Sequence, residues 1–148
     1  MVPGGRLLSV VIPYFNMGSY IDECIRSVKN SAYTDMELVI VNDGSTDESS
    51  LRKLAVLEKQ EKIRVIHQKN RGLALTRNEG ARQAAGGYLA FLDADDKVDP
   101  TYYEKAIRTL EKMTMSISPA PGYDISRTAI SCGRPLRLSP LMHWFTIL

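Results

Sequence analysis

Three aspartates lie within four positions at the end of an apolar run, in the segment YLAFLDADD. Asp93, Asp95 and Asp96 follow the mostly apolar residues 88–92. Adjacent carboxylates repel one another unless a cation neutralises them. Carboxylate oxygens suit Mg²⁺ and Mn²⁺, and Mg²⁺ is usually held by one or two carboxylates together with the phosphates of a substrate. The Asp-x-Asp pair therefore indicates a metal-bound diphosphate, and a solvated polar turn is the alternative.

Two other chemistries of acidic loops fit this segment poorly. A calcium-binding EF-hand loop starting at Asp93 would have Lys97 at its fifth position and Val98 at its sixth, where a glycine is required. A haloacid-dehalogenase-type nucleophile loop normally follows the first strand and has Thr or Val where this chain has Lys97. Asp99 and Pro100 have a structural explanation, since Asp99 can cap a following helix and proline is favoured in the first helical turn.

The acidic loop is one of several polar loops that follow apolar strands. Strands are predicted from apolar runs at 7–12, 38–41, 63–67 and 88–92. Helical periodicity follows each of them, at 19–30, 45–61, 74–85 and 100–113. Such alternation is typical of a parallel sheet covered by helices on both faces, with ligands bound beyond the carboxyl ends of the strands. The loops PYFN, NDGSTD and DADD should therefore meet at one edge of the sheet.

The predicted helices have recognisable start signals. Ser19 and Ser45 each precede an acidic residue by three positions. This spacing is that of a capping box, in which the serine caps the helix. We therefore expect Ser19 and Ser45 to cap the first two helices.

Composition narrows the class of protein. The 148 residues carry a net charge of +2, with 44% hydrophobic and 24% charged residues. These values are typical of one soluble domain or part of one, and they do not favour a nucleic-acid partner. Cys24 and Cys132 lack zinc-site spacing, and Cys24 is predicted to be a buried thiol. The chain shows no membrane span or signal peptide, which predicts a cytoplasmic location and leaves peripheral attachment to the cytoplasmic face of a membrane open.

The alternation of strands and helices stops near residue 115. From 116 to 148, proline and serine are frequent, and Asp124 is the only carboxylate side chain. The pattern predicts a half-domain over 1–115 and an irregular tail over 116–148.

Four motifs together resemble those of family 2 glycosyltransferases, which have the GT-A fold. They are SVVIPYFN, VIVNDGSTDES, NRGLALTRNEG and GGYLAFLDADD, in the order and at the spacings usual in the family. The resemblance implies an α/β, Rossmann-like GT-A fold with a mostly parallel sheet that is truncated on its C-terminal side. It also implies that the chain is the nucleotide-sugar-binding N-terminal portion of such an enzyme.

The resemblance implies roles for residues of the first two loops. Pro13, Tyr14 and Asn16 would line the pocket for the base and the ribose. The ring of Tyr14 offers a face on which the base can stack. Asp43 would accept a hydrogen bond from the base, typically uracil.

The same resemblance implies roles for residues of the later loops. Arg77 and the loop 70–72 would help close the nucleotide site, although a solvated helix charge is the alternative for Arg77. Asp93 would approach the ribose, with Ala94 beside it in the nucleotide site. Asp95 would be the direct ligand of Mn²⁺ or Mg²⁺, the expected cofactor.

The implied activity is metal-assisted transfer of a sugar, with inversion, from a nucleotide-diphosphate donor that is expected to be UDP-linked. The acceptor would be a glycan, a lipid-linked glycan or another hydroxyl compound, as in polysaccharide biosynthesis for the cell envelope. Inverting members need a general base, which the family supplies from a later segment. Asp124 lacks the family's context, so no catalytic base is identified. The alternative is a truncated, catalytically incomplete fragment that at most binds nucleotide sugar.

Overall fold

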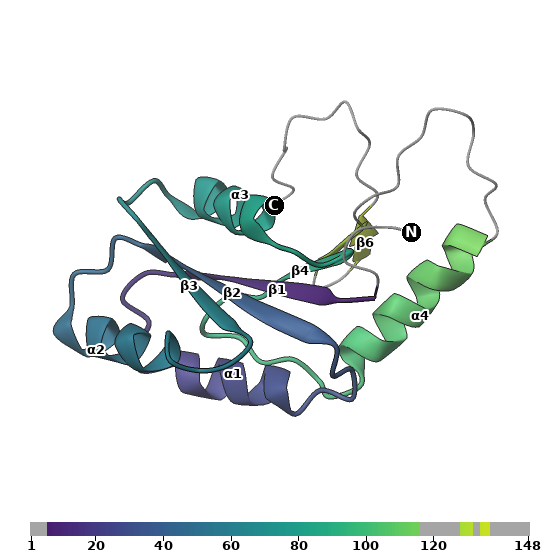
Figure 1. Cartoon of the computed structure of the whole chain (residues 1–148), viewed down its shortest axis with the longest axis horizontal. Coiled ribbons are helices and arrows are strands. Elements are labelled where there is room, and N and C mark those ends of the chain that lie inside the picture. The colour runs from purple at the N-terminus through teal and green to yellow at the C-terminus, as the bar shows by residue number, and fades with distance from the viewer. Residues whose placement is uncertain (1–5, 116–127, 132–133, 137–148) are drawn as a thin grey trace.

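The computed structural model describes residues 6–115, 128–131 and 134–136 (Figure 1). Four strands alternate with four helices, and two short strands follow. In chain order the elements are β1 (Leu8–Tyr14), α1 (Ile21–Lys29), β2 (Met36–Asp43), α2 (Glu48–Leu57), β3 (Ile63–Gln68), α3 (Leu73–Gln83), β4 (Tyr88–Phe91), α4 (Tyr102–Met115), β5 (Thr128–Ser131) and β6 (Arg134–Leu136).

The strands form one sheet in the order β3-β2-β1-β4-β5-β6. Every neighbouring pair is parallel except β5 and β6, which are antiparallel. From β1 the chain continues outward through β2 and β3, and β4 then returns to the opposite side of β1. The strand order therefore reverses between β1 and β4, which is where open α/β sheets bind their ligands. The predicted α/β class with a mostly parallel sheet is confirmed.

Helices cover both faces of the sheet, as predicted. On one face, Val10 and Ile12 of β1 belong to a buried cluster that includes side chains of α1, α2 and α4. On the other face, Val11 and Val39 pack with Ala81 of α3. Figure 1 shows α3 on the opposite side of the sheet from α1 and α2. All of β1 is buried, because it has a strand on each side and helices on both faces.

The helix α3 lies unusually close to the sheet because Gly80 has no side chain. A Cβ atom on Gly80 would lie 2.3 Å from Cγ1 of Val11 and 3.0 Å from Cγ2 of Val41. Carbon atoms in contact are normally about 3.5–4.0 Å apart. The glycine therefore sets the height of α3 above β1 and β2, and with it the position of the residues at the start of α3.

The first two helices do not begin as predicted. Tyr20 precedes α1 and makes no capping hydrogen bond with its side chain. Asp47 caps α2, and its Oδ1 accepts a hydrogen bond from the Ser50 N–H at 2.8 Å. The predicted caps Ser19 and Ser45 were wrong. Ser45 instead joins two loops, since its Oγ accepts a hydrogen bond from the N–H of Asn16 at 3.0 Å.

The segment predicted to be an irregular tail contributes two strands, so that prediction was wrong for residues 128–131 and 134–136. β5 pairs with β4 in parallel, and β6 pairs with β5. Strands of four and three residues are too short to show a period in the sequence, and their pairing partners specify them. Asp124 lies outside the described residues. The division of the chain at residue 115 stays a prediction.

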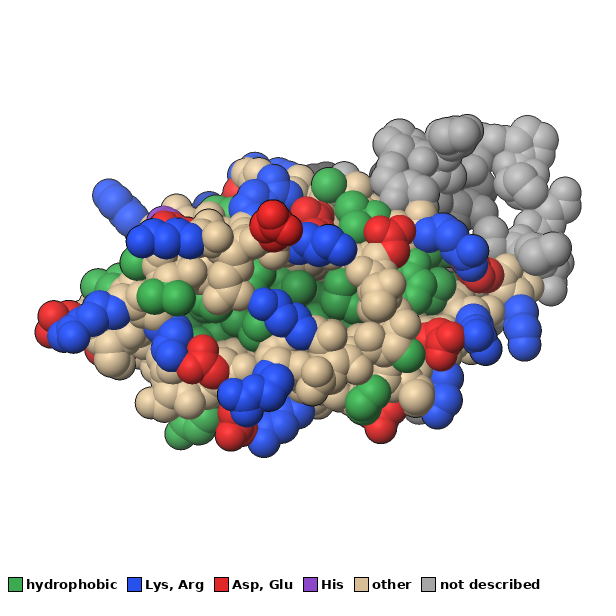
Figure 2. Space-filling view, turned by 60° about the horizontal axis from the view of Figure 1, so that its bottom comes forward, with side chains coloured by type: hydrophobic (Ala, Val, Ile, Leu, Met, Phe, Trp, Pro, Cys, Tyr) green, Lys and Arg blue, Asp and Glu red, His purple; other side chains and the backbone are tan. Residues whose placement is uncertain are grey.

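Charges of both signs are interspersed on the surface. Figure 2 shows Lys and Arg side chains next to Asp and Glu, with hydrophobic side chains gathered in a hollow across the middle of that face. On the face seen there, neither sign of charge forms a broad patch.

Candidate functional site

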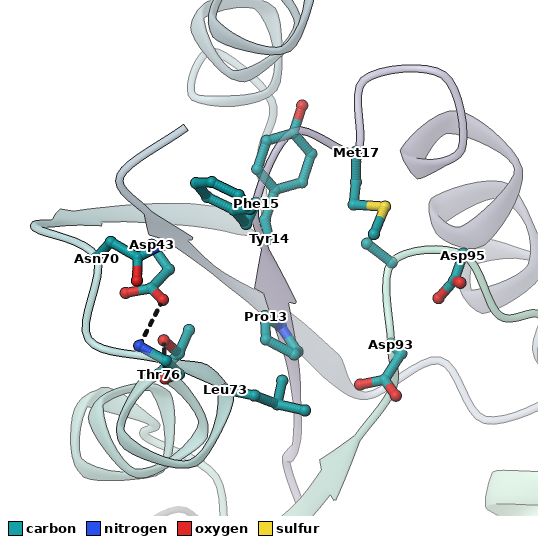
Figure 3. A pocket seen from close by; sticks show the side chains of 12 residues that line it. Pro13, Tyr14, Phe15, Met17, Asp43, Asn70, Leu73, Thr76, Asp93 and Asp95 are labelled. Atoms are coloured by element: carbon teal, nitrogen blue, oxygen red, sulfur yellow. Dashed lines mark hydrogen bonds between the residues drawn. The ribbon is translucent and has the colours of Figure 1, made fainter. Parts of the chain in front are cut away.

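A pocket of about 360 Å³ lies at the carboxyl ends of the parallel strands (Figure 3). This volume is within the usual range for small-molecule sites, about 300–1,000 Å³. The pocket is lined by Pro13, Tyr14, Phe15, Met17, Asp43, Asn70, Gly72, Leu73, Thr76, Asp93, Ala94 and Asp95. These residues lie at the ends of β1 and β2, in the loops after β1, β3 and β4, and in the first turn of α3, so the three predicted polar loops do meet at one edge of the sheet.

The predicted site residues divide into two groups. Lining residues of the pocket include Pro13, Tyr14, Asp43, Asp93, Ala94 and Asp95. Asn16 and Arg77 are not among them, but each bonds to a loop or side chain that forms the pocket wall. Figure 3 shows Asp43 on one side of β1 and the pair Asp93 and Asp95 on the other.

The aromatic ring that the pocket offers to a ligand is that of Phe15. Phe15 is 43% exposed, whereas Tyr14 is 1% exposed. The Tyr14 hydroxyl donates a hydrogen bond to the carbonyl of Ser50 at 3.1 Å, and burial raises the pKa of the phenol. Every second side chain of a strand lies on the same face, so the Tyr14 ring points into the same part of the core as Val10 and Ile12. Because both faces of β1 are buried, the alternation of side chains along the strand does not by itself tell which of the two rings is open.

Asn16 acts on the pocket indirectly. It has a positive φ of 53°, a conformation that asparagine tolerates better than most residues. Its Oδ1 accepts hydrogen bonds from the N–H groups of Thr46 (2.8 Å) and Asp47 (3.2 Å), and its Nδ2 donates to Oγ1 of Thr46 (3.2 Å). Asn16 therefore ties the loop after β1 to the loop after β2, and it is not among the residues that line the pocket.

Asp43 is buried and accepts several hydrogen bonds. Its Oδ1 accepts from Nε2 of Gln68 at 2.7 Å and from the N–H of Arg71 at 2.8 Å, while Oδ2 accepts from the N–H of Gly72 at 2.9 Å. Burial alone would raise the pKa of Asp43, but these hydrogen bonds and one from Thr76 lower it. The carboxylate therefore stays ionised at neutral pH and holds the loop before α3 against the end of β2.

Arg77 of α3 forms an ion pair with Asp93. Its guanidinium nitrogen NH2 lies 2.6 Å from Oδ1 of Asp93, and the two side chains are 26% and 40% exposed. Such charge-assisted hydrogen bonds are stronger than neutral ones. Nε of Arg77 is buried and has no hydrogen-bond partner among the described residues. Arg77 is thus a partly buried link between α3 and the loop after β4, and not a solvated helix charge.

The acidic loop after β4 has few carboxylates for a metal. Asp93 and Asp95 both line the pocket, and Asp95 is exposed. Within the described residues, no group of three or more His, Cys, Asp or Glu side chains is placed to hold a metal ion. Mg²⁺ and Mn²⁺ sites that include a substrate diphosphate need only one or two carboxylates. The carboxylates of Asp93 and Asp95 therefore fit a cation that arrives with a diphosphate ligand.

Cys24 lies beneath the same loop. Its thiol donates a hydrogen bond to the carbonyl of Asp93 at 3.6 Å. Burial, with the negative charges of Asp96, Asp95 and Asp93, raises the pKa of Cys24 to about 12. The predicted buried thiol is confirmed, and it is not a thiolate at neutral pH.

The family model for glycosyl transferase family 2 matches residues 9–132. The chain belongs to glycosyltransferase family 2. The match continues past residue 115 and includes β5, so this strand is part of the family's domain.

Two curated family members show how much of such a protein the chain covers. The uncharacterized glycosyltransferase YibD of Escherichia coli (strain K12) is 43% identical over 104 residues, which are 70% of this chain and 30% of that protein. The glycosyltransferase GlyG of Streptococcus pneumoniae serotype 4 is 35% identical over 108 residues, which are 72% of this chain and 36% of that protein. The chain therefore spans about a third of the length of these relatives.

Solved structures of similar shape confirm the predicted GT-A fold. S. aureus TarS in complex with UDP has a TM-score of 0.64 and 25% sequence identity, covering 72% of this chain and 32% of TarS. The mannosyltransferase PcManGT from Pyrobaculum calidifontis, in complex with GDP-Man and Mn²⁺, has a TM-score of 0.54 and 25% identity, covering 61% of this chain and 28% of PcManGT. In the described part of this chain, no helix has both the length and the apolar character needed to span a membrane.

Proposed function

We propose that the chain forms the donor-binding portion of a metal-assisted, inverting glycosyltransferase that uses a nucleotide-diphosphate sugar. The observation that carries this proposal is the pocket at the point where the strand order reverses. It brings together an exposed aromatic ring (Phe15), an ionised acceptor (Asp43) and a pair of carboxylates (Asp93 and Asp95). These groups match the base, the ribose and the metal-bound diphosphate of such a donor.

The base would bind between Phe15 and the loop before α3. Stacking on an aromatic ring contributes about 1–3 kcal/mol per base. Asp43 would accept a hydrogen bond from a ring N–H, and Asn70 lines the pocket beside it with an amide that can bond to a base carbonyl. TarS has been solved with UDP and UDP-GlcNAc, and PcManGT with GDP-Man. Uracil and guanine both carry a ring N–H, so these donors support the same mode of recognition.

The diphosphate would lie at the acidic loop. Asp95 would be the direct ligand of Mn²⁺ or Mg²⁺, and Asp93, held by Arg77, would bind the ribose. A bound divalent cation would stabilise the charge that builds up on the leaving diphosphate. Arg77 supplies a fixed positive charge at the same edge of the sheet.

A second candidate function is binding of the donor without transfer. An inverting enzyme needs a general base for the acceptor hydroxyl. Among the described pocket carboxylates, Asp43 and Asp93 are engaged by hydrogen bonds, and Asp95 is the proposed metal ligand. This observation favours the second candidate for the described part of the chain. The proposal for the whole protein also includes an acceptor and a place of action. The acceptor would be a glycan, a lipid-linked glycan or another hydroxyl compound of the cell envelope. The enzyme would act at the cytoplasmic face of the membrane.

Calorimetric titration with UDP tests the donor site. We expect UDP to bind more tightly with Mn²⁺ than without it, and Asp95→Ala to remove this gain. Asp96→Ala is the matched control, because Asp96 is an exposed neighbour outside the pocket lining. Equal UDP affinity with and without Mn²⁺ in the unaltered chain would contradict the proposal. Detection of a sugar-transfer product would refute the second candidate.

A further inference from the structure

The acidic loop, residues 92–101, joins β4 to α4 and contains neither helix nor strand. Two residues of α1 hold its backbone at separate points. The thiol of Cys24 donates a hydrogen bond to the carbonyl of Asp93 at 3.6 Å. The N–H of Val98 donates a hydrogen bond to Oγ of Ser27 at 3.1 Å. Residues three apart on a helix are neighbours, so one face of α1 fixes the loop at both points.

The segment between these two points turns the carboxylate of Asp95 outward. Ala94 is 3% exposed and belongs to the buried cluster on that face of the sheet, and Val98 packs against the same cluster. Asp95 lies between them and is exposed. Among the described residues, its side chain has no hydrogen-bond or ion-pair partner. The position of this carboxylate therefore depends on how the backbone on each side of it is held (Figure 3).

The hydroxyl of Ser27 takes part in two hydrogen bonds. It donates its hydrogen to the carbonyl of Cys24 at 2.7 Å, so only its lone pairs remain for the N–H of Val98. The bond to the helix backbone thus fixes the direction in which the oxygen can accept. Serine is a weaker helix former than alanine, so helix stability alone does not explain Ser27.

Another contact between α1 and the loop contributes less. Nζ of Lys97 lies 2.5 Å from Oε2 of Glu23, but the two side chains are 62% and 58% exposed. Exposed ion pairs contribute little, because solvent screens them and long side chains lose entropy when they are held. The hydrogen bond between Val98 and Ser27 is therefore the nearest partly buried anchor that follows Asp95 in the chain.

We infer that Ser27 is a positioning residue for the proposed metal site: its hydroxyl holds the backbone of Val98, so that the carboxylate of Asp95 stays within reach of a cation bound to the diphosphate. If the loop were free, binding of the cation would have to order it, at a cost in conformational entropy. Without a cation, Asp95 and the diphosphate are both negative and do not attract each other. Ser27 therefore matters for binding only when the cation is present. This inference rests on the proposed function, because Asp95 is the metal ligand proposed there.

The substitution Ser27→Ala tests the inference. Calorimetry gives the dissociation constant of UDP with and without Mn²⁺, and the ratio of the two constants is the gain that the cation supplies. We expect Ser27→Ala to reduce this gain about two- to tenfold, the factor that one neutral hydrogen bond supplies. The affinity for UDP without Mn²⁺ should not change. Ser27→Thr keeps the hydroxyl and should keep most of the gain.

Thr109→Ala is the matched control. The hydroxyl of Thr109 donates to the carbonyl of Lys105 at 2.9 Å, within α4, as the hydroxyl of Ser27 does within α1. Thr109 is exposed and, among the described residues, makes no hydrogen bond to the acidic loop. Loss of its hydroxyl should leave the gain from Mn²⁺ unchanged.

A second measurement needs no cation. Cys24 lies beneath the acidic loop, so a thiol-specific reagent reaches it only when the loop opens. In the metal-free protein, Ser27→Ala should be labelled at Cys24 faster than the unaltered chain. An equal rate of labelling would mean that Ser27 does not restrain the loop, and it would overturn the inference.

The outcomes separate this inference from the proposed function. An unchanged gain from Mn²⁺ in Ser27→Ala would overturn the positioning role and leave the metal-assisted donor site standing. UDP binding weakened by the same factor with and without Mn²⁺ would also overturn it, because the pocket as a whole would then be affected. If Ser27→Ala fails to fold, Ser27→Cys keeps the size of the side chain with a weaker acceptor and should lose part of the gain. An unaltered chain in which Mn²⁺ gives no gain would overturn both.

Discussion

Gly80→Ala is expected to push α3 away from the sheet and to disturb the pocket. The added Cβ would lie 2.3 Å from Cγ1 of Val11, 3.3 Å from Cγ2 of Val11 and 3.0 Å from Cγ2 of Val41. Normal contact between carbon atoms is about 3.5–4.0 Å, so α3 and β1 must separate by about 1 Å or the valine must leave its rotamer. Because Arg77 lies one turn before Gly80, the shift would also move its guanidinium relative to Asp93.

The expected loss of stability is about 2 kcal/mol. Overpacking a buried site costs up to about 3 kcal/mol, and we take the upper value because the valines belong to two adjacent strands of a rigid sheet. Alanine in place of glycine within a helix returns about 1 kcal/mol. For a folded unit of roughly 110 residues, a loss of about 2 kcal/mol lowers the melting temperature by roughly 8 °C.

A double-mutant cycle with Val11→Ala provides the assay. Val11→Ala removes both Cγ atoms that the new methyl group would meet, and alone it should cost about 1–3 kcal/mol through the cavity that it leaves. In the double variant the methyl group added at position 80 fills that cavity, so the combined loss should fall short of the sum of the two single losses by about 1–2 kcal/mol. Thermal melts followed by circular dichroism measure all four proteins. Additive losses would refute the reasoning, because they would mean that Gly80 and Val11 do not meet.

Three further predictions concern the pocket and its surroundings. Phe15→Ala should weaken UDP binding about tenfold through loss of stacking. Tyr14→Phe should reduce the free energy of unfolding by about 1 kcal/mol, because the hydrogen bond to Ser50 is lost, and it should have little effect on UDP binding. Asp43→Asn should reduce the free energy of unfolding by about 1.5–3 kcal/mol at pH 7, because an amide cannot accept all the hydrogen bonds that the ionised carboxylate accepts. The folded-state pKa of Asp43 is lowered, so its contribution to stability is fully present above the unfolded-state pKa. This contribution is lost as the pH falls through the folded-state pKa. The thiol of Cys24, with its pKa raised to about 12, should resist a thiol-specific reagent at pH 8 until the protein is unfolded.

Each of these predictions has an outcome that contradicts it. Unchanged UDP binding in Phe15→Ala would contradict the stacking role of Phe15. For Asp43→Asn, the difference in melting temperature from the unaltered chain should shrink between pH 7 and pH 3, and a constant difference would show that the charge of Asp43 is not involved. Labelling of the folded chain at Cys24, identified by mass spectrometry of its peptide, would show that the loop after β4 opens readily.

The sequence predicted the fold well where local patterns are sufficient. The strands are continuous apolar runs, and the helices between them have one apolar face, so the parallel alternation is visible without any knowledge of contacts. The edge at which the polar loops meet follows from the same alternation, because all parallel strands end on one side. The positions of helix starts were less predictable, since Ser45 and Asp47 offer similar local capping chemistry before α2 and the contacts of neighbouring loops decide between them.

The roles of individual site residues depended on residues far away in the chain. Whether Tyr14 or Phe15 faces the pocket depends on which side of β1 the helices α1 and α2 cover. The hydrogen bond from Gln68 to Asp43 depends on the register of these two residues, which is set by the pairing of β2 with β3. The strand β5 is too short to be recognised from its sequence, and it forms by pairing with β4 at the edge of the sheet.

The amino-acid sequence by itself thus determined the family, the parallel α/β sheet and the edge at which the polar loops meet. Only the tertiary structure decided which ring lies open in the pocket, which groups donate hydrogen bonds to Asp43, and that Arg77 holds Asp93. The physical reason is that apolar periodicity and turn chemistry act over a few neighbouring residues. A hydrogen bond such as that between Gln68 and Asp43 joins positions that become neighbours only when the sheet forms.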